Sequence, residues 1–286
     1  MIIWLASYPK SGNTLVRAML SAYFFTKDGK FNFDTIKYIK QFPDLKLFEK
    51  IGVNTSDPME IVKNYINIQN QINKKDKNSV RFFKTHSGLS NINGHQFTNL
   101  KNSLGVIYIV RDPRSIVKSY ANHNQMTVES ASDRMLEYGA TLGGIKNSIN
   151  EVNRITTYMN SWSSNYESWK EFKKFDRYLL VKYEDMINDK ENVLLSILRF
   201  IHKLSKAKFI INENKLKNIL ETTSFEHMKS LEKDKGFEES IKIKDNKKIT
   251  FFKYGPKENA PQFLTAKIKE KLESALKKEM EELGYL

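Results

Sequence analysis

The first 23 residues combine an apolar run, a short polar turn and an apolar stripe of helical spacing. The run Ile2-Ile3-Trp4-Leu5 predicts a short buried strand. An i, i+1, i+4, i+5, i+8 stripe predicts an amphipathic helix, and its members are Leu15, Val16, Met19, Leu20 and Tyr23. The turn between them holds Pro9, Lys10, Ser11, Gly12, Asn13 and Thr14. Strands that lead through a turn into a helix build α/β proteins, so the start of the chain predicts that fold class.

The polar turn suits an anion. The first N–H groups of a helix lack internal partners and carry partial positive charge. Gly12 allows a close approach of the backbone, Lys10 adds a charge, and the hydroxyls of Ser11 and Thr14 can donate hydrogen bonds. The turn is not a Walker A loop, because GxxxxGK[ST] is absent and the lysine precedes the glycine. This difference argues against a kinase or ATPase, while a purely structural βα turn stays an alternative.

The turn also resembles a known motif. Residues 8–14, YPKSGNT, are similar to the loop of sulfotransferases that holds the 5′-phosphosulfate end of PAPS (3′-phosphoadenosine 5′-phosphosulfate). The family more usually has a second Thr in place of Asn13, and often a Trp in place of Leu15. The resemblance implies PAPS as cofactor, PAP (3′-phosphoadenosine 5′-phosphate) as product, and cofactor contacts from Lys10, Ser11, Gly12, Asn13 and Thr14.

Residues 80–86 predict a second strand, which ends in a histidine. Ligands of open α/β sheets gather at the carboxyl ends of the strands, so His86 is expected on the same side as the turn. A lone histidine is otherwise structural or exposed. The segment Lys84-Thr85-His86 resembles the K-T-H segment of sulfotransferases, which implies that His86 is the catalytic base. It also implies that Lys84, together with Lys10, neutralises charge at the sulfuryl group and the departing phosphate.

The clearest buried strand, residues 104–110, runs into Arg111-Asp112-Pro113-Arg114 and a helix. Arg111 and Ser119 could hold a phosphate between a guanidinium fork and a hydroxyl. The stretch resembles the 3′-phosphate site of sulfotransferases, RDPR-x₄-SY. A salt-bridged turn is the structural alternative.

Three later segments resemble nucleotide contacts of the same family. Residues 178–183 predict a strand whose Tyr183 is implied to lie near the adenine. Residues 222–229 are similar to T-S-F-x-x-M-K, which implies nucleoside contacts from Thr223 and Phe225. Residues 251–255 resemble F-R-K-G, a second 3′-phosphate clamp with Lys253 and Gly255.

The second clamp departs from the family pattern. Lys253 stands where Arg is usual, and Tyr254 stands where Lys is usual. Lysine keeps the charge but lacks the bidentate fork. We expect either a weaker contact or a replacement by Lys257.

The resemblance runs in family order from residue 8 to residue 255, which implies a single sulfotransferase-like domain, 1–286. The fold expected is a helix-rich, P-loop-like three-layer sandwich with a central parallel sheet. Periodicity agrees, because strands at 2–5, 80–85, 104–110 and 178–183 alternate with helices. Helices are also predicted at 59–72, 127–173, 184–202 and 264–283, whereas the charge-dense residues 232–250 predict a mobile segment.

Composition limits the other functions. The formal net charge of +14 allows a polyanionic partner, and a basic nucleic-acid-binding protein stays an alternative beside a P-loop phosphotransferase. The lysines are spread along the chain without an Arg-rich arm, so we expect no nucleic acid. The five histidines lack zinc-site spacing, and we expect no metal. The absence of cysteine and of long apolar runs leads us to expect a cytoplasmic protein without a signal peptide or membrane segment. A small-molecule acceptor is expected, with its pocket built by residues 27–79, and the last helix either covers the sheet or forms a homodimer interface.

Overall fold

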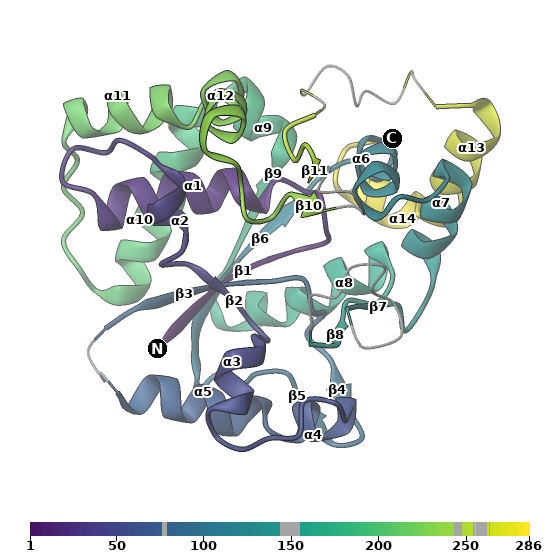
Figure 1. Ribbon diagram of the computed structural model, residues 1–286, viewed down its shortest axis with the longest axis horizontal. Helices are drawn as coiled ribbons and strands as arrows, with labels where there is room; N and C mark the ends of the chain where they lie inside the picture. The colour runs from purple at the N-terminus through teal and green to yellow at the C-terminus, as the bar shows by residue number, and fades with distance from the viewer. Residues whose placement is uncertain (76–78, 144–154, 243–247, 254, 256–261, 263) are drawn as a thin grey trace.

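The computed structural model describes residues 1–75, 79–143, 155–242, 248–253, 255, 262 and 264–286. At its centre is a five-stranded parallel sheet with the order β2-β3-β1-β6-β9 (Figure 1). Its strands are β1 (Ile2–Ser7), β2 (Lys40–Gln41), β3 (Arg81–Thr85), β6 (Ser103–Val110) and β9 (Tyr178–Lys182). The first strand of the chain is therefore the middle strand of the sheet, and the predicted central parallel sheet is confirmed.

Helices cover both faces of the sheet, as the alternating side chains of β1 require. Ile3 and Leu5 face one apolar cluster, while Ile2, Trp4 and Ala6 face the other. The helices that pack on the Ile3 face are α1 (Asn13–Phe25), α2 (Phe33–Ile36), α9 (Tyr183–Asn188), α10 (Lys190–Ser205), α11 (Glu213–Thr222) and α12 (Phe225–Lys235).

The opposite face carries the larger set of helices (Figure 1). They are α3 (Leu45–Glu49), α4 (Pro58–Lys63), α5 (Tyr65–Lys74), α6 (Pro113–Asn124), α7 (Val128–Leu136), α8 (Trp162–Trp169), α13 (Ala266–Ala275) and α14 (Lys277–Glu282), with a 3₁₀ segment at Lys170–Phe175. The spacing of seven residues between Trp162 and Trp169 predicts a common packing face, and both side chains are buried in this cluster. The result is the predicted helix-rich three-layer sandwich.

Short antiparallel pairs accompany the main sheet. They are β4 (Asn91–Ile92) with β5 (His95–Gln96), β7 (Thr141–Leu142) with β8 (Thr157–Tyr158), and β10 (Ile241–Lys242) with β11 (Lys248–Ile249). Within the described ranges, no helix is both long and apolar enough to cross a bilayer.

Several predicted helices are interrupted. The predicted helix 59–72 is two helices, α4 and α5, which meet at Asn64. The predicted helix 184–202 is also two, because Asp189 ends α9 and caps α10 by accepting from the Asn192 N–H at 3.2 Å. The last helix divides at Leu276 into α13 and α14. The range 127–173 contains α7 and α8 but also the pair β7 and β8, so its all-helical prediction was wrong.

Residues 232–250 are more ordered than their charge pattern predicts. Helix α12 continues to Lys235, and β10 pairs with β11 on either side of residues outside the described ranges. The carboxylate of Glu232, a buried residue of α12, accepts from the backbone N–H groups of Phe251 (2.7 Å) and Phe252 (2.9 Å). At least one charged side chain that the sequence pattern predicts to be exposed to solvent, that of Glu232, thus makes tertiary contacts.

Candidate active site

The sequence-predicted site residues converge at one edge of the central sheet. All described strands of this sheet run parallel, so their carboxyl ends lie along the same edge. The residues that follow directly are the turn 8–12 after β1, His86 after β3, Arg111 after β6 and Tyr183 after β9. Four separate segments therefore place polar or charged side chains at a common edge.

The turn after β1 has the backbone shape that the sequence predicts for an anion site. Gly12 has φ 99° and stands as the N-cap of α1, while Lys10 also has a positive φ of 67°. The first N–H groups of α1 follow directly, with the partial positive charge of a helix start. Among the described residues, the fully buried hydroxyl of Ser11 has no hydrogen-bond partner. A buried hydroxyl without a partner in this turn fits a site for an anionic oxygen.

Gly12 is required by its neighbour as well as by its backbone angle. A Cβ atom at this position would lie 2.5 Å from Cδ2 of Tyr183, the residue that begins α9. The aromatic ring therefore packs directly against the turn, which connects the end of β9 with the end of β1.

The Gly12→Ala substitution is expected to destabilise the protein more than Gly52→Ala does. Gly52 also has a positive φ, 75°, but a Cβ there would meet nothing within 4 Å. Gly52→Ala should cost about 1–2 kcal/mol from backbone strain alone. Gly12→Ala should cost roughly 1–3 kcal/mol more, because Tyr183 must move. Urea unfolding of the two variants measures the difference, and equal losses would contradict the close packing of Tyr183.

Asn13 and Thr14 complete the turn in different ways. The Asn13 amide donates to the carbonyl oxygen of Leu5 (2.9 Å) and to Oγ of Ser7 (3.1 Å). Its side chain therefore ties α1 to β1, and the group that it can offer an anion is its backbone N–H. Thr14 is buried in the first turn of α1.

Lys10 lies in an environment that weakens its hold on a proton. Its ammonium is 3.9 Å from the ring centroid of Phe251. Burial lowers the pKa of Lys10 to about 8. The charges of Lys84 and Arg111 act in the same direction, while the nearby carboxylate of Glu239 acts against them. The lysine is thus mainly protonated at neutral pH and begins to lose its charge just above it.

His86 has a defined tautomer. Its Nδ1 is 2.8 Å from the carbonyl oxygen of Ser7, and a carbonyl can only accept, so Nδ1 carries the hydrogen. The lone pair is therefore on Nε2. Asn165 fixes the backbone of the same residue by donating to the His86 carbonyl at 3.0 Å. Burial of the ring, followed by the charge of Lys84, lowers the pKa of His86 to about 3, so the imidazole is neutral at physiological pH.

Lys84 belongs to a series of connected ion pairs that the sequence did not reveal. Its ammonium pairs with Oε2 of Glu239 at 3.2 Å, and Oε1 of Glu239 pairs with the guanidinium of Arg17. Arg17, in α1, also donates to the carbonyl oxygen of Ile39 at 3.0 Å. Glu239 is 222 residues from Arg17 along the chain, and no local pattern connects them.

Arg111 is held against the turn. Its side chain is only 6% exposed, its Cζ is 4.1 Å from the ring centroid of Tyr183, and it donates to the Lys10 carbonyl at 3.4 Å. Its buried Nε has no hydrogen-bond partner among the described residues. The neighbouring Arg114 is used differently, because it pairs with Asp112 at 2.7 Å and with Glu273. The salt-bridged-turn alternative therefore describes Arg114 but not Arg111.

The remaining predicted contacts are less uniform. Ser119 is partly buried on α6. The hydroxyl of Thr223 donates to the Ile219 carbonyl at 2.6 Å and so caps α11. Phe225 begins α12 with its ring 6.2 Å from that of Phe252. Lys253 is exposed and donates to Oδ1 of Asn122, at the end of α6, at 3.1 Å.

The second clamp is described only in part. Gly255 is among the residues that the structure describes, and it interacts with other residues of the chain. Tyr254 and Lys257 lie outside the described residues, so the choice between a weaker clamp and a replacement by Lys257 stays a prediction. His123, which we consider as a second candidate for the base, lies at the end of α6 with its ring 6.1 Å from that of Phe251.

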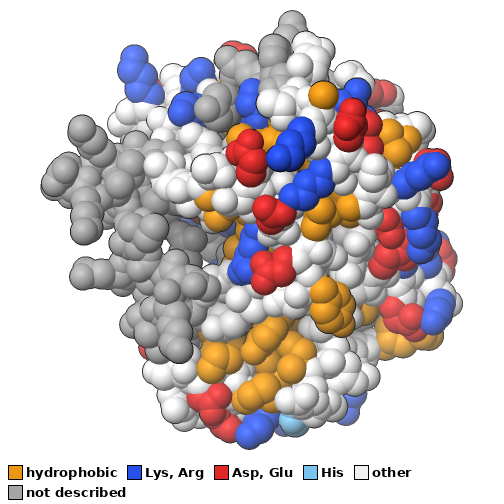
Figure 2. All heavy atoms as spheres, turned by 90° about the vertical axis from the view of Figure 1, so that its right-hand side faces the viewer, with side chains coloured by type: hydrophobic (Ala, Val, Ile, Leu, Met, Phe, Trp, Pro, Cys, Tyr) orange, Lys and Arg blue, Asp and Glu red, His pale blue; other side chains and the backbone are white. Residues whose placement is uncertain are grey.

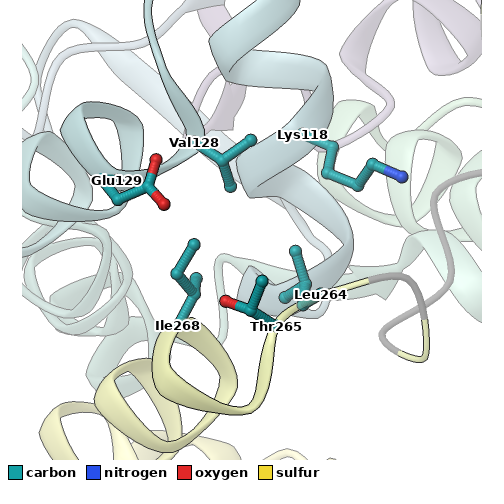
Figure 3. Close-up of a pocket in the computed structure, with 6 residues that line it drawn as sticks. All are labelled: Lys118, Val128, Glu129, Leu264, Thr265 and Ile268. Carbon is teal, nitrogen blue, oxygen red and sulfur yellow. The ribbon is translucent and has the colours of Figure 1, made fainter.

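A pocket of about 150 Å³ has walls formed by residues other than the predicted site residues. Figure 3 shows its walls, which come from α6 and α7 on one side and from the start of α13 on the other. They are formed by Lys118, Val128, Glu129, Leu264, Thr265 and Ile268. None of the sequence-predicted site residues lines it, so it is not the centre of the arrangement described above.

The fold and site define a class of protein. A parallel α/β sheet with an anion-binding turn at its carboxyl edge and a basic cluster around it is the architecture of enzymes that handle phosphorylated nucleotides. The family model described as "Sulfotransferase domain" matches residues 2–284. The chain belongs to this family.

Curated relatives agree with this membership. The chain is 28% identical over 229 residues to luciferin sulfotransferase of Photinus pyralis, a match that covers 80% of this chain. It spans only 56% of that relative's length. It is 25% identical over 282 residues to sulfotransferase 1B1 of Canis lupus familiaris, covering 97% of this chain and 83% of the relative.

Solved structures share the fold. Mouse sulfotransferase SULT7A1, complexed with PAP, superimposes with a TM-score of 0.56 at 18% identity, covering 98% of this chain and 84% of that chain. Retinol dehydratase in a complex with retinol and PAP gives a TM-score of 0.56 at 15% identity, covering 98% and 81%. At these identities the likeness concerns the fold.

Proposed function

We propose that the chain transfers a sulfuryl group from PAPS to a hydroxyl or amine of a small acceptor, with His86 as general base and without a metal. The observation that carries this proposal is the meeting, at one sheet edge, of the turn 8–12 with Lys84, His86 and Arg111. The PAP in the complexes of the two solved relatives supports the choice of nucleotide. The domain acts, in this proposal, as one unit over residues 1–286.

The proposed nucleotide contacts follow from the placement of the groups. The turn residues Lys10, Ser11, Gly12, Asn13 and Thr14 would hold the 5′ end, with Asn13 contributing through its backbone. Arg111 and Ser119 would hold the 3′-phosphate, supported by Lys253 and Gly255. Two buried atoms, Oγ of Ser11 and Nε of Arg111, have no hydrogen-bond partner among the described residues, and they fit a ligand rich in anionic oxygens. Tyr183, Thr223 and Phe225 would surround the nucleoside.

The proposed chemistry uses protein groups in three roles. PAPS supplies the sulfuryl group, whose acceptor must lose a proton. His86 takes that proton at Nε2, while the bond from Nδ1 to the Ser7 carbonyl keeps the ring in the required tautomer. Lys10 and Lys84 place positive charge where negative charge grows on the leaving phosphate and on the sulfuryl oxygens.

The low pKa of His86 ensures that the base is unprotonated, but it also makes the imidazole a weak base. The carboxylate of Glu239 already opposes the effect of Lys84 on the pKa of His86 in the free protein, and a bound sulfuryl donor adds further negative charge beside the same lysine. We therefore expect the basicity of His86 to rise when the sulfuryl donor is bound.

PAP should raise the melting temperature of the protein without added metal, and 5′-AMP should raise it far less. The physical reason is that 5′-AMP leaves the Arg111 site without a phosphate. A thermal-shift titration measures both. Equal stabilisation by the two nucleotides would remove the basis for assigning Arg111 to a 3′-phosphate.

The same titration separates the alternatives. A P-loop phosphotransferase should respond to ATP with Mg²⁺, and a nucleic-acid-binding protein should respond to an oligonucleotide. On the described part of the face in Figure 2, acidic side chains are interspersed among the basic ones, a mixture that does not favour a nucleic-acid surface. Among the described residues, no group of three His, Asp or Glu side chains is arranged to hold a metal ion. The acceptor, a cytoplasmic location and a homodimer stay predictions.

A further inference from the structure

Glu239 places a carboxylate among the cations of the proposed site. Its two oxygens divide between Lys84 (Oε2, 3.2 Å) and Arg17 (Oε1). The side chain is 27% exposed, whereas those of Lys84 and Arg17 are 10% and 6% exposed. The charge of this carboxylate also acts on Lys10 and on His86. A single acid thus interacts with both lysines and with the histidine that the proposed transfer uses.

The carboxylate is a permanent anion. Burial alone would raise the pKa of Glu239, but the charges of Lys84 and Arg17 and their hydrogen bonds outweigh it and hold the pKa well below its usual range. The neighbouring Glu238 differs sharply, since it is 77% exposed and pairs with the surface residue Lys37 at 3.2 Å. Of these two neighbouring acids, only Glu239 therefore contacts a residue of the proposed site.

The segment that carries Glu239 is anchored on both sides. Upstream, Glu232 of α12 accepts from Oγ of Ser240, a hydrogen bond that joins the helix to the residue after Glu239. Downstream, the same carboxylate holds the N–H groups of Phe251 and Phe252, and the Phe251 ring contacts Lys10. These contacts hold the residues on both sides of Glu239 in the chain while its carboxylate pairs with Lys84.

We propose that the carboxylate of Glu239 competes with the anionic 5′ end of the nucleotide for Lys84. The carboxylate occupies this lysine in the free protein, and the nucleotide must displace it. This inference rests on the proposed function. A carboxylate oxygen and a phosphate or sulfuryl oxygen make the same charge-assisted bond to an ammonium, so the two compete for one donor. Arg17 retains the other carboxylate oxygen during this exchange, which keeps Glu239 ready to return to Lys84 when product leaves.

Glu239→Gln is expected to bind PAP about tenfold more tightly than the wild type. The amide keeps the shape and can still accept from Arg17, but it carries no charge with which to hold Lys84 or repel a phosphate. The matched control is Glu238→Gln, which makes the same change of net charge one residue earlier on the surface and should leave the affinity for PAP unchanged. Titration calorimetry at pH 6.5 works below the pKa of about 8 that Lys10 has in the wild type. Because Glu239→Gln removes a charge that raises this pKa, the titration is repeated at pH 5.5 to check that the gain does not depend on the protonation of Lys10.

A second ligand tests whether the effect belongs to the 5′ end. Adenosine 3′-monophosphate lacks the 5′-phosphate, so it should bind the wild type and the Glu239→Gln variant equally well. Equal binding of this ligand also shows that the substituted site is still folded. A gain for both ligands, or no gain for PAP over the Glu238→Gln control, would overturn the competition. If the wild type fails to bind PAP at all, the proposed function fails instead.

Discussion

The His86→Ala variant is expected to turn over acceptor at a rate lower by about 10²-fold or more, with an affinity for PAP within a few-fold of wild type. The base acts on the acceptor proton, while other groups hold the nucleotide. Steady-state sulfuryl transfer with radiolabelled PAPS gives the rate, and titration with PAP gives the affinity. The separation of the two quantities distinguishes loss of a base from loss of a folded site.

Two further variants sharpen this test. His86→Asn should be almost as inactive, because an amide can form hydrogen bonds but cannot take a proton. His123→Ala is the matched control, since His123 lies near Phe251, the residue whose ring contacts Lys10, and has no proton transfer assigned to it in this proposal. Near-normal turnover of His86→Ala combined with inactive His123→Ala would transfer the role to His123.

The pH profile adds an independent reading of the same residue. The pKa of His86 is lowered to about 3, so the free enzyme keeps a neutral imidazole across the usual assay range. Protonation removes the base only as the pH falls toward that value. The kcat/KM of the wild type should therefore show no acid limb from His86 between pH 8 and about pH 5. An acid limb near the ordinary histidine pKa that vanishes in His86→Asn would contradict this environment.

The parts of the site that the sequence predicted are those with local signals. The turn at 8–14 is flanked by a buried strand and an amphipathic stripe, and Lys84-Thr85-His86 and Arg111 each follow an apolar run. In a parallel sheet these ends must meet, so knowing the strands was enough to bring the residues together. The same reasoning could not give the tautomer of His86, which depends on the position of the Ser7 carbonyl.

The missed features depend on particular hydrogen bonds and ion pairs that form only in the folded chain. Glu239 lies in a charge-dense stretch whose composition resembles that of solvated segments, and only the folded chain brings it to Lys84, 155 residues away. The side chain of Asn13 looked like a donor to the anion, but the carbonyl of Leu5 engages it. The break at Asp189 was also missed, because the start of the new helix is marked only by the bond from the Asn192 N–H to the side chain of Asp189.

Arg111→Ala and Lys10→Ala are expected to damage different quantities. Loss of a desolvated, charge-assisted contact costs roughly 2–4 kcal/mol, so Arg111→Ala should weaken PAP binding by a factor of tens or more. Arg111→Lys should fall between this variant and wild type, because lysine keeps the charge but loses the fork. Lys10→Ala should reduce transfer more than it reduces PAP affinity, because its charge is placed where charge develops.

Lys10 also predicts a pH dependence that Arg111 cannot produce. With the pKa of Lys10 lowered to about 8, a rise in pH above that value removes a positive charge from the turn, so the affinity of the wild type for PAP should decline. Arg111 stays charged over this range, and Arg111→Ala should therefore keep the decline at a lower overall affinity. The decline should begin at a higher pH in this variant, because the charge of Arg111 is one of the causes that lower the pKa of Lys10. Lys10→Ala should lose the decline. Calorimetric titrations of PAP from pH 6.5 to 9.5 measure all three profiles. Of these two side chains, only Lys10 can lose its proton in this pH range. If Lys10→Ala and Arg111→Ala showed the same dependence of PAP affinity on pH and the same ratio of transfer rate to PAP affinity, the turn and the Arg111 site would not divide these roles.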